Sequence, residues 1–247
     1  MSCYEALADS YDGLTQDIDY AGMLQFMQTL LQQAGKQPKT VLDLACGTGS
    51  MTLLLAQQGY EVIGADLSED MLTEASQKLM QLEQNHPLLI CQPMQELTLP
   101  QPVDWVVCCL DSLNYLTNPA DCKQTFARVY AALQPGGVFV FDINTPYKLK
   151  GLDGQTFLDE NEDTYCVWRA EFSEEENSVF YGMDLFQREG EHWLRSFEEH
   201  QEYAYCPEDL QQWLLEAGFK SVRQFGDCRL TPPADTEQRI YFLAVKE

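Results

Sequence analysis

The feature that most constrains the fold is an apolar run that stops abruptly at two glycines, in the stretch Thr-Val-Leu-Asp-Leu-Ala-Cys-Gly-Thr-Gly over residues 40–49. Ser50 and the mostly apolar residues 51–56 follow at once, so the stretch predicts a buried strand, a tight turn and the start of a helix. Gly47 and Gly49 lack a β-carbon and suit a sharp bend or a close approach to a ligand. Because the first N–H groups of a helix are free to donate, we predict that a small ligand binds at this turn.

The spacing of the glycines distinguishes between two kinds of nucleotide site. A dinucleotide fingerprint requires G-x-G-x-x-G, but Thr52 stands where the third glycine would follow Gly47 and Gly49. The chain instead has D-x-A-x-G-x-G, which begins at Asp43 and has Ala45 in its third position. This pattern resembles motif I of the class I S-adenosylmethionine-dependent methyltransferases, in which many members have glycine at the Ala45 position.

A second carboxylate ends the next predicted strand, residues 60–66, where Asp66 follows Asp43 by 23 residues. An acidic side chain at this place can accept hydrogen bonds from both hydroxyls of a ribose. The alternative for Asp66 is an acid that favours the start of a helix, because Ser68 and two further acids follow it. For Asp43 the alternative is a solvated acid at a strand end. We predict that both belong to the ligand site.

The resemblance implies that the cofactor is S-adenosylmethionine. It covers residues 36–145 well and the C-terminal strand pair loosely. In these enzymes a Tyr-Asp pair and other aromatic residues that precede the sheet often close over the cofactor, although packing of an N-terminal helix on the core would also explain them. Met71 stands where family members pack an apolar side chain on the adenine. The cofactor-binding residues that the resemblance implies are Tyr11, Tyr20, Asp43, Ala45, Gly47, Gly49, Asp66, Leu67, Met71, Met94, Gln95, Asp111 and Ser112.

The sequence departs from the family at Pro93, where related enzymes commonly have an aspartate that accepts a bond from the adenine N6 amine. Proline offers neither a carboxylate nor a backbone N–H. We therefore expect adenine recognition to rely on the backbone of Met94, on Gln95 or on apolar stacking.

A further polar segment, Asp-Ser-Leu-Asn-Tyr at residues 111–115, follows the predicted strand over residues 103–110. Ligands lie at the carboxyl ends of the strands in open α/β sheets, so this segment should face the same crevice as the glycine turn. It resembles motif IV of a bacterial small-molecule methyltransferase subgroup and lacks the Pro-Pro-aromatic motif of enzymes that methylate nucleic-acid amines. Turn formation is the alternative role for Asp111 and Asn114.

The fold class that these elements predict is α/β, with a Rossmann-like, doubly wound, mostly parallel seven-stranded sheet and an inserted small antiparallel β subdomain. Residues 1–150 would form an N-terminal helical lid and the cofactor-binding core, and residues 207–247 a C-terminal helix and strand pair that complete the core sheet. Residues 151–206 contain 15 acids and three bases. Apolar residues alternate there with polar ones, which predicts an antiparallel sheet that is apolar on one face and acidic on the other and covers the crevice.

The predicted chemistry is a methyl transfer by in-line displacement. S-adenosylmethionine carries its methyl group on a sulfonium, so the protein mainly has to hold a nucleophile in line and exclude water, without a metal or a covalent intermediate. An amine acceptor must also lose a proton. Our catalytic candidates, as bases or orienting groups, are Asp111, Tyr115 and His200, with Asp142 and Tyr147 as further options. For His200 a surface or structural role is the common alternative.

Composition restricts the partners. The formal charge of −24 would repel nucleic acid and anionic membranes, and the sequence has no cluster of basic residues, no apolar window of membrane-spanning length and no signal-peptide pattern. Nine cysteines without a C-x-x-C pair fit reduced thiols, several of them in predicted core strands at Cys91, Cys108 and Cys109. We therefore expect a cytoplasmic enzyme with a small-molecule substrate and no metal. The rival hypotheses are a non-catalytic cofactor-binding regulator and an NAD-dependent oxidoreductase; the acceptor and the oligomeric state stay open.

Overall fold

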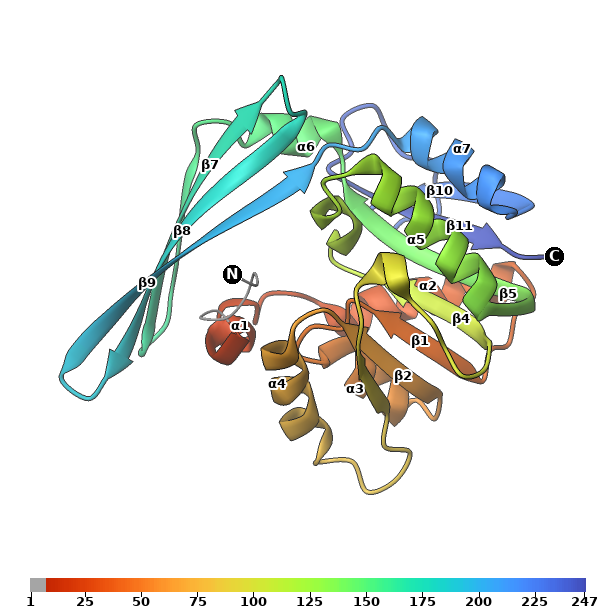
Figure 1. The fold of residues 1–247 in the computed structure, drawn as a ribbon, viewed down its shortest axis with the longest axis horizontal. Helices are drawn as coiled ribbons and strands as arrows, with labels where there is room; N and C mark the ends of the chain where they lie inside the picture. The colour runs from red at the N-terminus through yellow and green to blue at the C-terminus, as the bar shows by residue number, and fades with distance from the viewer. Residues whose placement is uncertain (1–7) are drawn as a thin grey trace.

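The computed structural model describes residues 8–247, and the apolar run of the glycine motif forms a central strand in it (Figure 1). Within these residues seven strands make up a core sheet. They are β1 (Thr40–Leu44), β2 (Glu61–Asp66), β3 (Leu88–Cys91), β4 (Val103–Cys108), β5 (Leu133–Asn144), β10 (Ser221–Gly226) and β11 (Arg239–Val245).

The order of the strands across the core sheet is β10-β11-β5-β4-β1-β2-β3. Strands β1 to β5 run parallel, whereas β11 is antiparallel to both β5 and β10. The chain reverses its direction of winding at β1, which pairs with β2 on one side and with β4 on the other. Such a switch point opens a crevice at the carboxyl ends of the two central strands. The predicted fold class is confirmed for the described residues.

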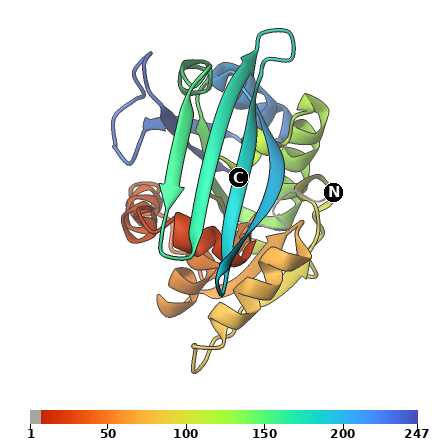
Figure 2. The ribbon, with the colours of Figure 1, turned by 90° about the vertical axis from the view of Figure 1, so that its left-hand side faces the viewer.

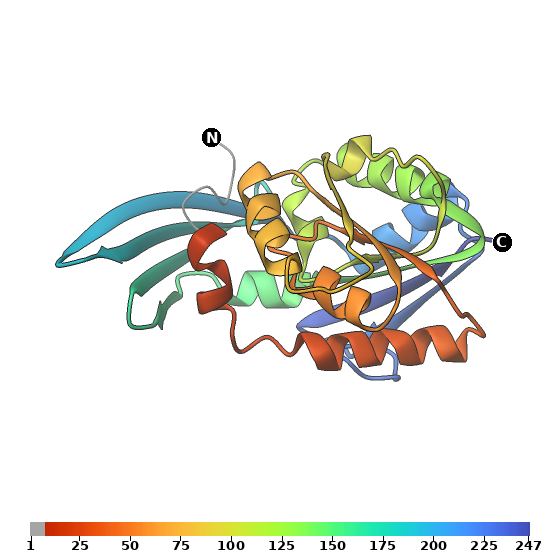
Figure 3. The same ribbon diagram turned by 90° about the horizontal axis from the view of Figure 1, so that it is seen from below.

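Helices cover both faces of the core sheet, as Figures 1 and 3 show. On one face α5 (Pro119–Ala132) and α7 (Pro207–Ala217) pack on a core that includes Phe126, Phe139 and Phe141. The other face packs on α2 (Tyr20–Gln33) and α3 (Ser50–Gln57). The remaining helical elements are α1 (Ala8–Leu14), α4 (Glu69–Leu79), α6 (Pro146–Gly151) and the short 3-10 helices η1 (Met94–Glu96) and η2 (Ser112–Tyr115).

The strands β6 (Thr156–Glu160), β7 (Thr164–Ser173), β8 (Ser178–Glu189) and β9 (His192–Tyr203) form a separate antiparallel sheet within the described residues (Figure 2). Its inner face carries Cys166, Met183 and Leu185, which pack against Tyr11 and Leu14 of α1. Helix α1 therefore lies between the second sheet and the core (Figures 1 and 3).

The prediction that the other face of this sheet is acidic is wrong. Trp193 pairs with Arg188 and Phe197 with Asp184, on the outer face, and the two aromatic residues are 48% and 51% exposed. Because the turn between β8 and β9 has two residues, odd-numbered residues of β8 pair with even-numbered residues of β9, so Trp193 and Phe197 lie on the face opposite Met183 and Leu185. Cys91 is likewise exposed rather than part of the core.

Candidate active site

The glycine turn between β1 and α3 has the left-handed backbone that its sequence requires. Ala45, Gly47 and Gly49 have φ angles of 58°, 53° and 78°. A β-carbon on Gly49 would lie 3.0 Å from the β-carbon of Ala75 in α4, so only glycine fits where the two helices approach each other. Gly49 is the N-cap of α3 and has no side chain to cap it, which leaves the first N–H groups of that helix available to a ligand.

Asp43 lies beneath this turn and is buried rather than solvated. The hydroxyl of Thr52 donates to its Oδ2 over 2.5 Å and so connects β1 to the first turn of α3. Burial raises the pKa of Asp43 to about 7, and the Thr52 hydroxyl acts against this rise. Asp43 therefore organises the turn from below.

Asp66 joins the turn to the end of β2. Its Oδ2 accepts a hydrogen bond from the Gly47 N–H over 2.8 Å, and its Oδ1 accepts one from the Ser68 N–H over 2.9 Å. Burial raises the pKa of this carboxyl, and the two N–H donors lower it. Each oxygen keeps a lone pair for a further donor, so the geometry suits the two hydroxyls of a ribose. An adenosyl cofactor thus fits the residues present here.

The predicted adenine side is formed by three neighbouring elements. Met71 is buried in the first turn of α4, where its N–H donates to Ser68 Oγ, whereas Leu67 is 67% exposed. Pro93 precedes η1, and Met94 packs partly against the core. The carbonyl of Gln95 accepts a bond from the side chain of Gln124 over 2.9 Å. That carbonyl already has one partner, while the Met94 N–H, the Gln95 side chain and the apolar surface of Met94 remain the candidates for adenine recognition.

Asp111 and Ser112 follow β4 in an unusual turn. Leu110 and Asp111 both have left-handed backbones, with φ angles of 57° and 52°. Asp142, which is fully buried at the end of β5, accepts the N–H groups of both residues over 2.9 Å each. The guanidinium of Arg239 in β11 donates to Asp142 and, over 2.6 Å, to Asp111. Ser112 Oγ donates to the carbonyl of Cys109 over 2.8 Å.

Helix α1 closes over the glycine turn from the side of the second sheet. Asp12 accepts the hydroxyl of Thr48 over 2.6 Å and forms an ion pair of 2.6 Å with Lys78 of α4. Lys78 also donates to Ser50 over 2.8 Å. Burial raises the pKa of Tyr11, and the neighbouring Tyr20 and Asp111 add to this rise. Burial also raises the pKa of Tyr20, to about 12.

The inner face of the second sheet supplies the opposite wall. The ring of His200 lies 6.1 Å from that of Tyr115 and 6.3 Å from that of Trp168, measured between centroids, and its Nε2 is 3.1 Å from Glu198 Oε2. The structure thus brings His200 to the segment that contains Asp111 and Tyr115. His200 is buried, so its alternative as a surface histidine is wrong. Tyr147 is 53% exposed.

Four polar groups of the site were not among the sequence candidates. Glu202 Oε2 accepts a bond from Asn144 Nδ2 over 2.8 Å, and Lys148 donates to Asn144 Oδ1 over 2.8 Å. The fourth group is Arg239. Burial raises the pKa of Glu202 to about 8, and repulsion from Asp111 contributes to the rise. Only Asn144 had a sequence signal, because it follows closely after the apolar run over residues 138–141.

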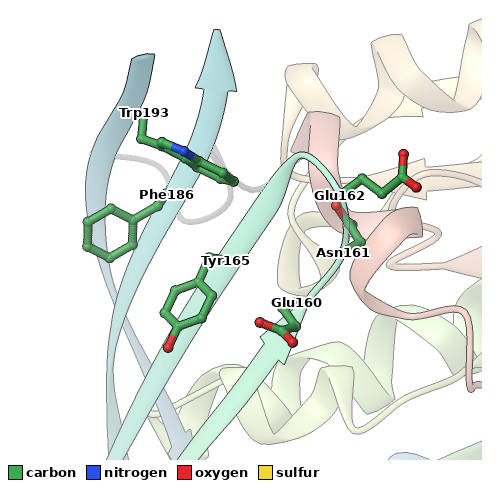
Figure 4. A pocket seen from close by; sticks show the side chains of 6 residues that line it. All are labelled: Glu160, Asn161, Glu162, Tyr165, Phe186 and Trp193. Atoms are coloured by element: carbon green, nitrogen blue, oxygen red, sulfur yellow. The ribbon is translucent and has the colours of Figure 1, made fainter. Parts of the chain in front are cut away.

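A pocket of about 430 Å³, larger than one of about 110 Å³ beside Gly136, lies near the β6–β7 turn of the second sheet (Figure 4) and contains none of the motif residues. We therefore assign the site to the crevice at the switch point.

In the described part of the chain no three His, Cys, Asp or Glu side chains are grouped to hold a metal ion. Across residues 8–247 no helix has the length and apolarity needed to cross a membrane. The lining residues of the larger pocket are Glu160, Asn161, Glu162, Tyr165, Phe186 and Trp193.

Comparisons with known proteins agree with this site. Residues 41–137 match the family described as methyltransferase domain. The YqeM protein of Bacillus subtilis (strain 168), which carries the name of a methyltransferase, is 35% identical over 98% of this chain and 97% of its own length. A crystal structure of an S-adenosylmethionine-dependent methyltransferase from Clostridium acetobutylicum ATCC 824 has a TM-score of 0.87 at 32% identity and covers 99% of both chains.

The fold is also shared with CalS10 from Micromonospora echinaspora, an amino pentose methyltransferase solved with S-adenosylmethionine bound. Its TM-score is 0.76 at 20% identity, over 100% of this chain and 98% of the other. The glycine turn, Asp66 and the full-length similarity thus agree on one conclusion: the chain belongs to the class I S-adenosylmethionine-dependent methyltransferases.

Proposed function

We propose that this methyltransferase transfers the methyl group to the nitrogen of a small-molecule amine that lies between the motif IV segment and the inner face of the second sheet. The observation that carries the proposal is the chemistry of that face. It brings the rings of Trp168, Tyr181 and His200 and the carboxylate of Glu202 toward Asp111 and Tyr115.

Carboxylates and aromatic faces both attract an ammonium group. The charge of Asp111 raises the pKa of Tyr181 and of Glu202, which shows that the three groups lie within electrostatic reach of one another. Aromatic rings bind ammonium ions through their faces, most strongly where water is excluded. A cationic acceptor is therefore favoured over an anionic one.

An amine becomes a nucleophile only after it loses its proton. S-adenosylmethionine supplies an electrophilic methyl group when it is bound, so the protein's task is to orient the nitrogen and remove the proton. Burial raises the pKa of Glu202 to about 8, so near neutral pH the smaller, ionised fraction of this group can accept a proton from an ammonium, and that fraction grows as the pH rises toward 8. His200, beside Glu198, is a second group that can orient the acceptor.

Some structural neighbours act on amines according to their names. They include the sugar N-methyltransferase KedS8 from Streptoalloteichus, with a TM-score of 0.78, and the amino pentose methyltransferase CalS10. At 20% identity both show the fold alone, but the similarity spans the whole chain, including the second sheet. This supports an acceptor held against that sheet.

The charge of the chain supports a small acceptor. With a formal charge of −24 the surface would repel the phosphates of a nucleic acid. We infer a cytoplasmic protein without a nucleic-acid or membrane partner, in keeping with its nine cysteines and their lack of a C-x-x-C pair.

The test uses matched acceptors that differ only at the nucleophile. Amino sugars and the same sugars with a hydroxyl in place of the amine are incubated with the protein and S-adenosylmethionine, and formation of S-adenosylhomocysteine is measured. We expect turnover of amines only, lowered by about tenfold or more in Glu202→Gln, the loss typical of a removed proton acceptor. Glu199→Gln, on the same strand but the opposite face, is the control and should retain activity. Methylation of the hydroxyl compounds would contradict the proposal.

A further inference from the structure

The turn after β4 contains two neighbouring residues in the left-handed region, Leu110 and Asp111, at φ angles of 57° and 52°. Residues other than glycine rarely adopt this backbone conformation, because their β-carbon then approaches the following carbonyl oxygen. Two such residues in succession, one of them a leucine, persist only where the surrounding structure holds them. The groups that hold them are therefore informative.

The turn is held by the two strands beyond β4. From β5, the carboxylate of Asp142 accepts the Leu110 N–H at Oδ1 and the Asp111 N–H at Oδ2, each over 2.9 Å. From β11, Arg239 donates to Asp142 and to the side chain of Asp111. One buried ion pair thus fixes both the main chain and the side chain of the turn. We call Asp142 and Arg239 the clamp.

The turn borders the cofactor crevice. Strand β4 pairs in parallel with β1, with Val107 beside Asp43, so the turn after β4 and the glycine turn after β1 lie at the same carboxyl edge of the sheet. Asp142 is fully buried beneath the turn, and Arg239 contacts the side chain of Asp111. The influence of Asp142 on a ligand must therefore pass through the residues of the turn that it holds.

We propose that Asp142 and Arg239 are positioning residues, which hold the Leu110–Asp111 turn in the shape that binding of the cofactor requires. The inference rests on the cofactor site described above and is independent of which acceptor is methylated. A solely structural role would lower stability without a selective effect on cofactor affinity, so the two roles can be separated.

The chain offers a matched control at the opposite end of the same strand. Asp104, near the start of β4, also accepts two main-chain N–H groups through its carboxylate, those of Lys39 and Thr40, over 2.9 and 3.0 Å. The amino end of a parallel strand lies away from the ligand crevice. Asp104→Asn and Asp142→Asn therefore remove the same kind of interaction, and only the second borders the crevice.

The experiment is calorimetric titration of the purified chain and its variants with S-adenosylmethionine and S-adenosylhomocysteine, together with thermal unfolding. We expect Asp142→Asn and Arg239→Gln to weaken S-adenosylmethionine binding by about tenfold or more, the equivalent of one strained residue left unsupported. Asp104→Asn should lower the melting temperature and leave the affinity within about twofold. Equal losses of affinity in Asp104→Asn and Asp142→Asn, or none in Asp142→Asn, would overturn the inference.

A rescue variant tests whether the clamp acts through the backbone. Glycine adopts the left-handed conformation without a steric cost, so Leu110→Gly added to Asp142→Asn should recover about threefold or more of the lost affinity. A further loss in the double variant would overturn the inference. If Asp142→Asn does not fold, Arg239→Lys is decisive: it keeps the charge but loses the forked contact, and we expect weaker binding of the cofactor, whereas unchanged binding would refute the clamp.

The cofactor site and the clamp can be refuted separately. A wild-type chain that binds neither adenosyl ligand would contradict the cofactor site on which both proposals rest. A wild-type chain that binds them, with an Asp142→Asn variant of equal affinity, would refute only the clamp.

Discussion

In the core sheet two buried carboxylates, Asp66 and Asp142, accept main-chain N–H groups, whereas in the second sheet Glu202 and His200 on the inner face are held by other side chains. Asp66 accepts from the backbones of Gly47 and Ser68, and Asp142 from those of Leu110 and Asp111. Glu202, by contrast, is held by the side chain of Asn144.

This difference determines how readily each part of the site can be altered by substitutions. Main-chain donors persist whatever side chains surround them, provided that the turn keeps its shape, so a site built on them can serve one cofactor in many proteins. A side-chain partner can be exchanged by a single substitution. The core sheet is therefore suited to a constant cofactor and the second sheet to a variable acceptor, which agrees with the amine proposal.

The largest expected effect comes from Asp66, because its loss breaks the main-chain arrangement of the cofactor site. Asp66→Ala removes the carboxylate and leaves the Gly47 and Ser68 N–H groups without their acceptor. Two charge-assisted hydrogen bonds to a ribose would also be lost, so we expect S-adenosylmethionine to bind about 100-fold or more weakly in a calorimetric titration. An affinity within about threefold of the wild type would contradict the role of Asp66.

A smaller effect is expected at Gly49, where the core site depends on the absence of a side chain. Gly49→Ala places a β-carbon 3.0 Å from that of Ala75 on a residue with a φ of 78°, so we expect a loss of about 1–3 kcal/mol in unfolding free energy. The control is Gly59→Ala, at a φ of 88° with no atom within 4 Å of the added carbon. Denaturant unfolding should show a larger loss for Gly49, and equal losses would mean that the approach of α3 to α4 is unimportant.

The core site could be predicted from the sequence because its interactions are local. Gly47 and Asp66 are 19 residues apart and follow consecutive strands, and the pattern of strand, turn and helix fixes where both lie. The start of the helix at Glu69 was likewise predictable from Ser68, which caps it. Residues at the ends of consecutive strands were thus enough to predict the fold and the cofactor.

The rest of the site depends on contacts between distant residues. Arg239 meets Asp111 across 128 residues and Glu202 meets Asn144 across 58, and no spacing rule links such pairs. The face on which Trp193 and Phe197 lie likewise depends on whether the turn before β9 has an even or an odd number of residues, because a one-residue change moves every side chain of a strand to the other face. Contacts between side chains that are distant in the sequence can be identified only after the fold is known.

The pH dependence of stability tests whether Glu202 is as buried as the second sheet requires. Its pKa is raised from 4.5 to about 8, so the folded state holds a proton that the unfolded state releases. Stability should therefore fall as pH rises from about 4.5 to about 8, by at most about 1.4 kcal/mol per pH unit for one such group. In Glu202→Gln the slope should be smaller but not zero, because the raised pKa of Asp43 acts in the same direction.

Urea unfolding across this pH range, with Glu199→Gln as the control on the outer face, measures the slopes. The control should show the slope of the wild type. An identical slope in Glu202→Gln would mean that this carboxylate is ionised and solvated in the folded protein.

The smallest effect is expected where the two regions meet, at the ion pair between Asp12 of α1 and Lys78 of α4. The side chain of Asp12 is 50% exposed, so solvent screens the pair and a double-mutant cycle should give a coupling of about 0.5–1 kcal/mol. Because Asp12 also accepts the hydroxyl of Thr48 in the glycine turn, the pair links the helix that carries Tyr11 to the cofactor site. Asp12→Ala and Lys78→Ala should each weaken cofactor binding by about two- to fivefold, and this loss of affinity should be smaller at high salt. The double variant should lose no more affinity than the worse of the two single variants. Additive losses that do not respond to salt would show that α1 and the core contribute separately, and that the cofactor site is complete without the helix that connects it to the second sheet.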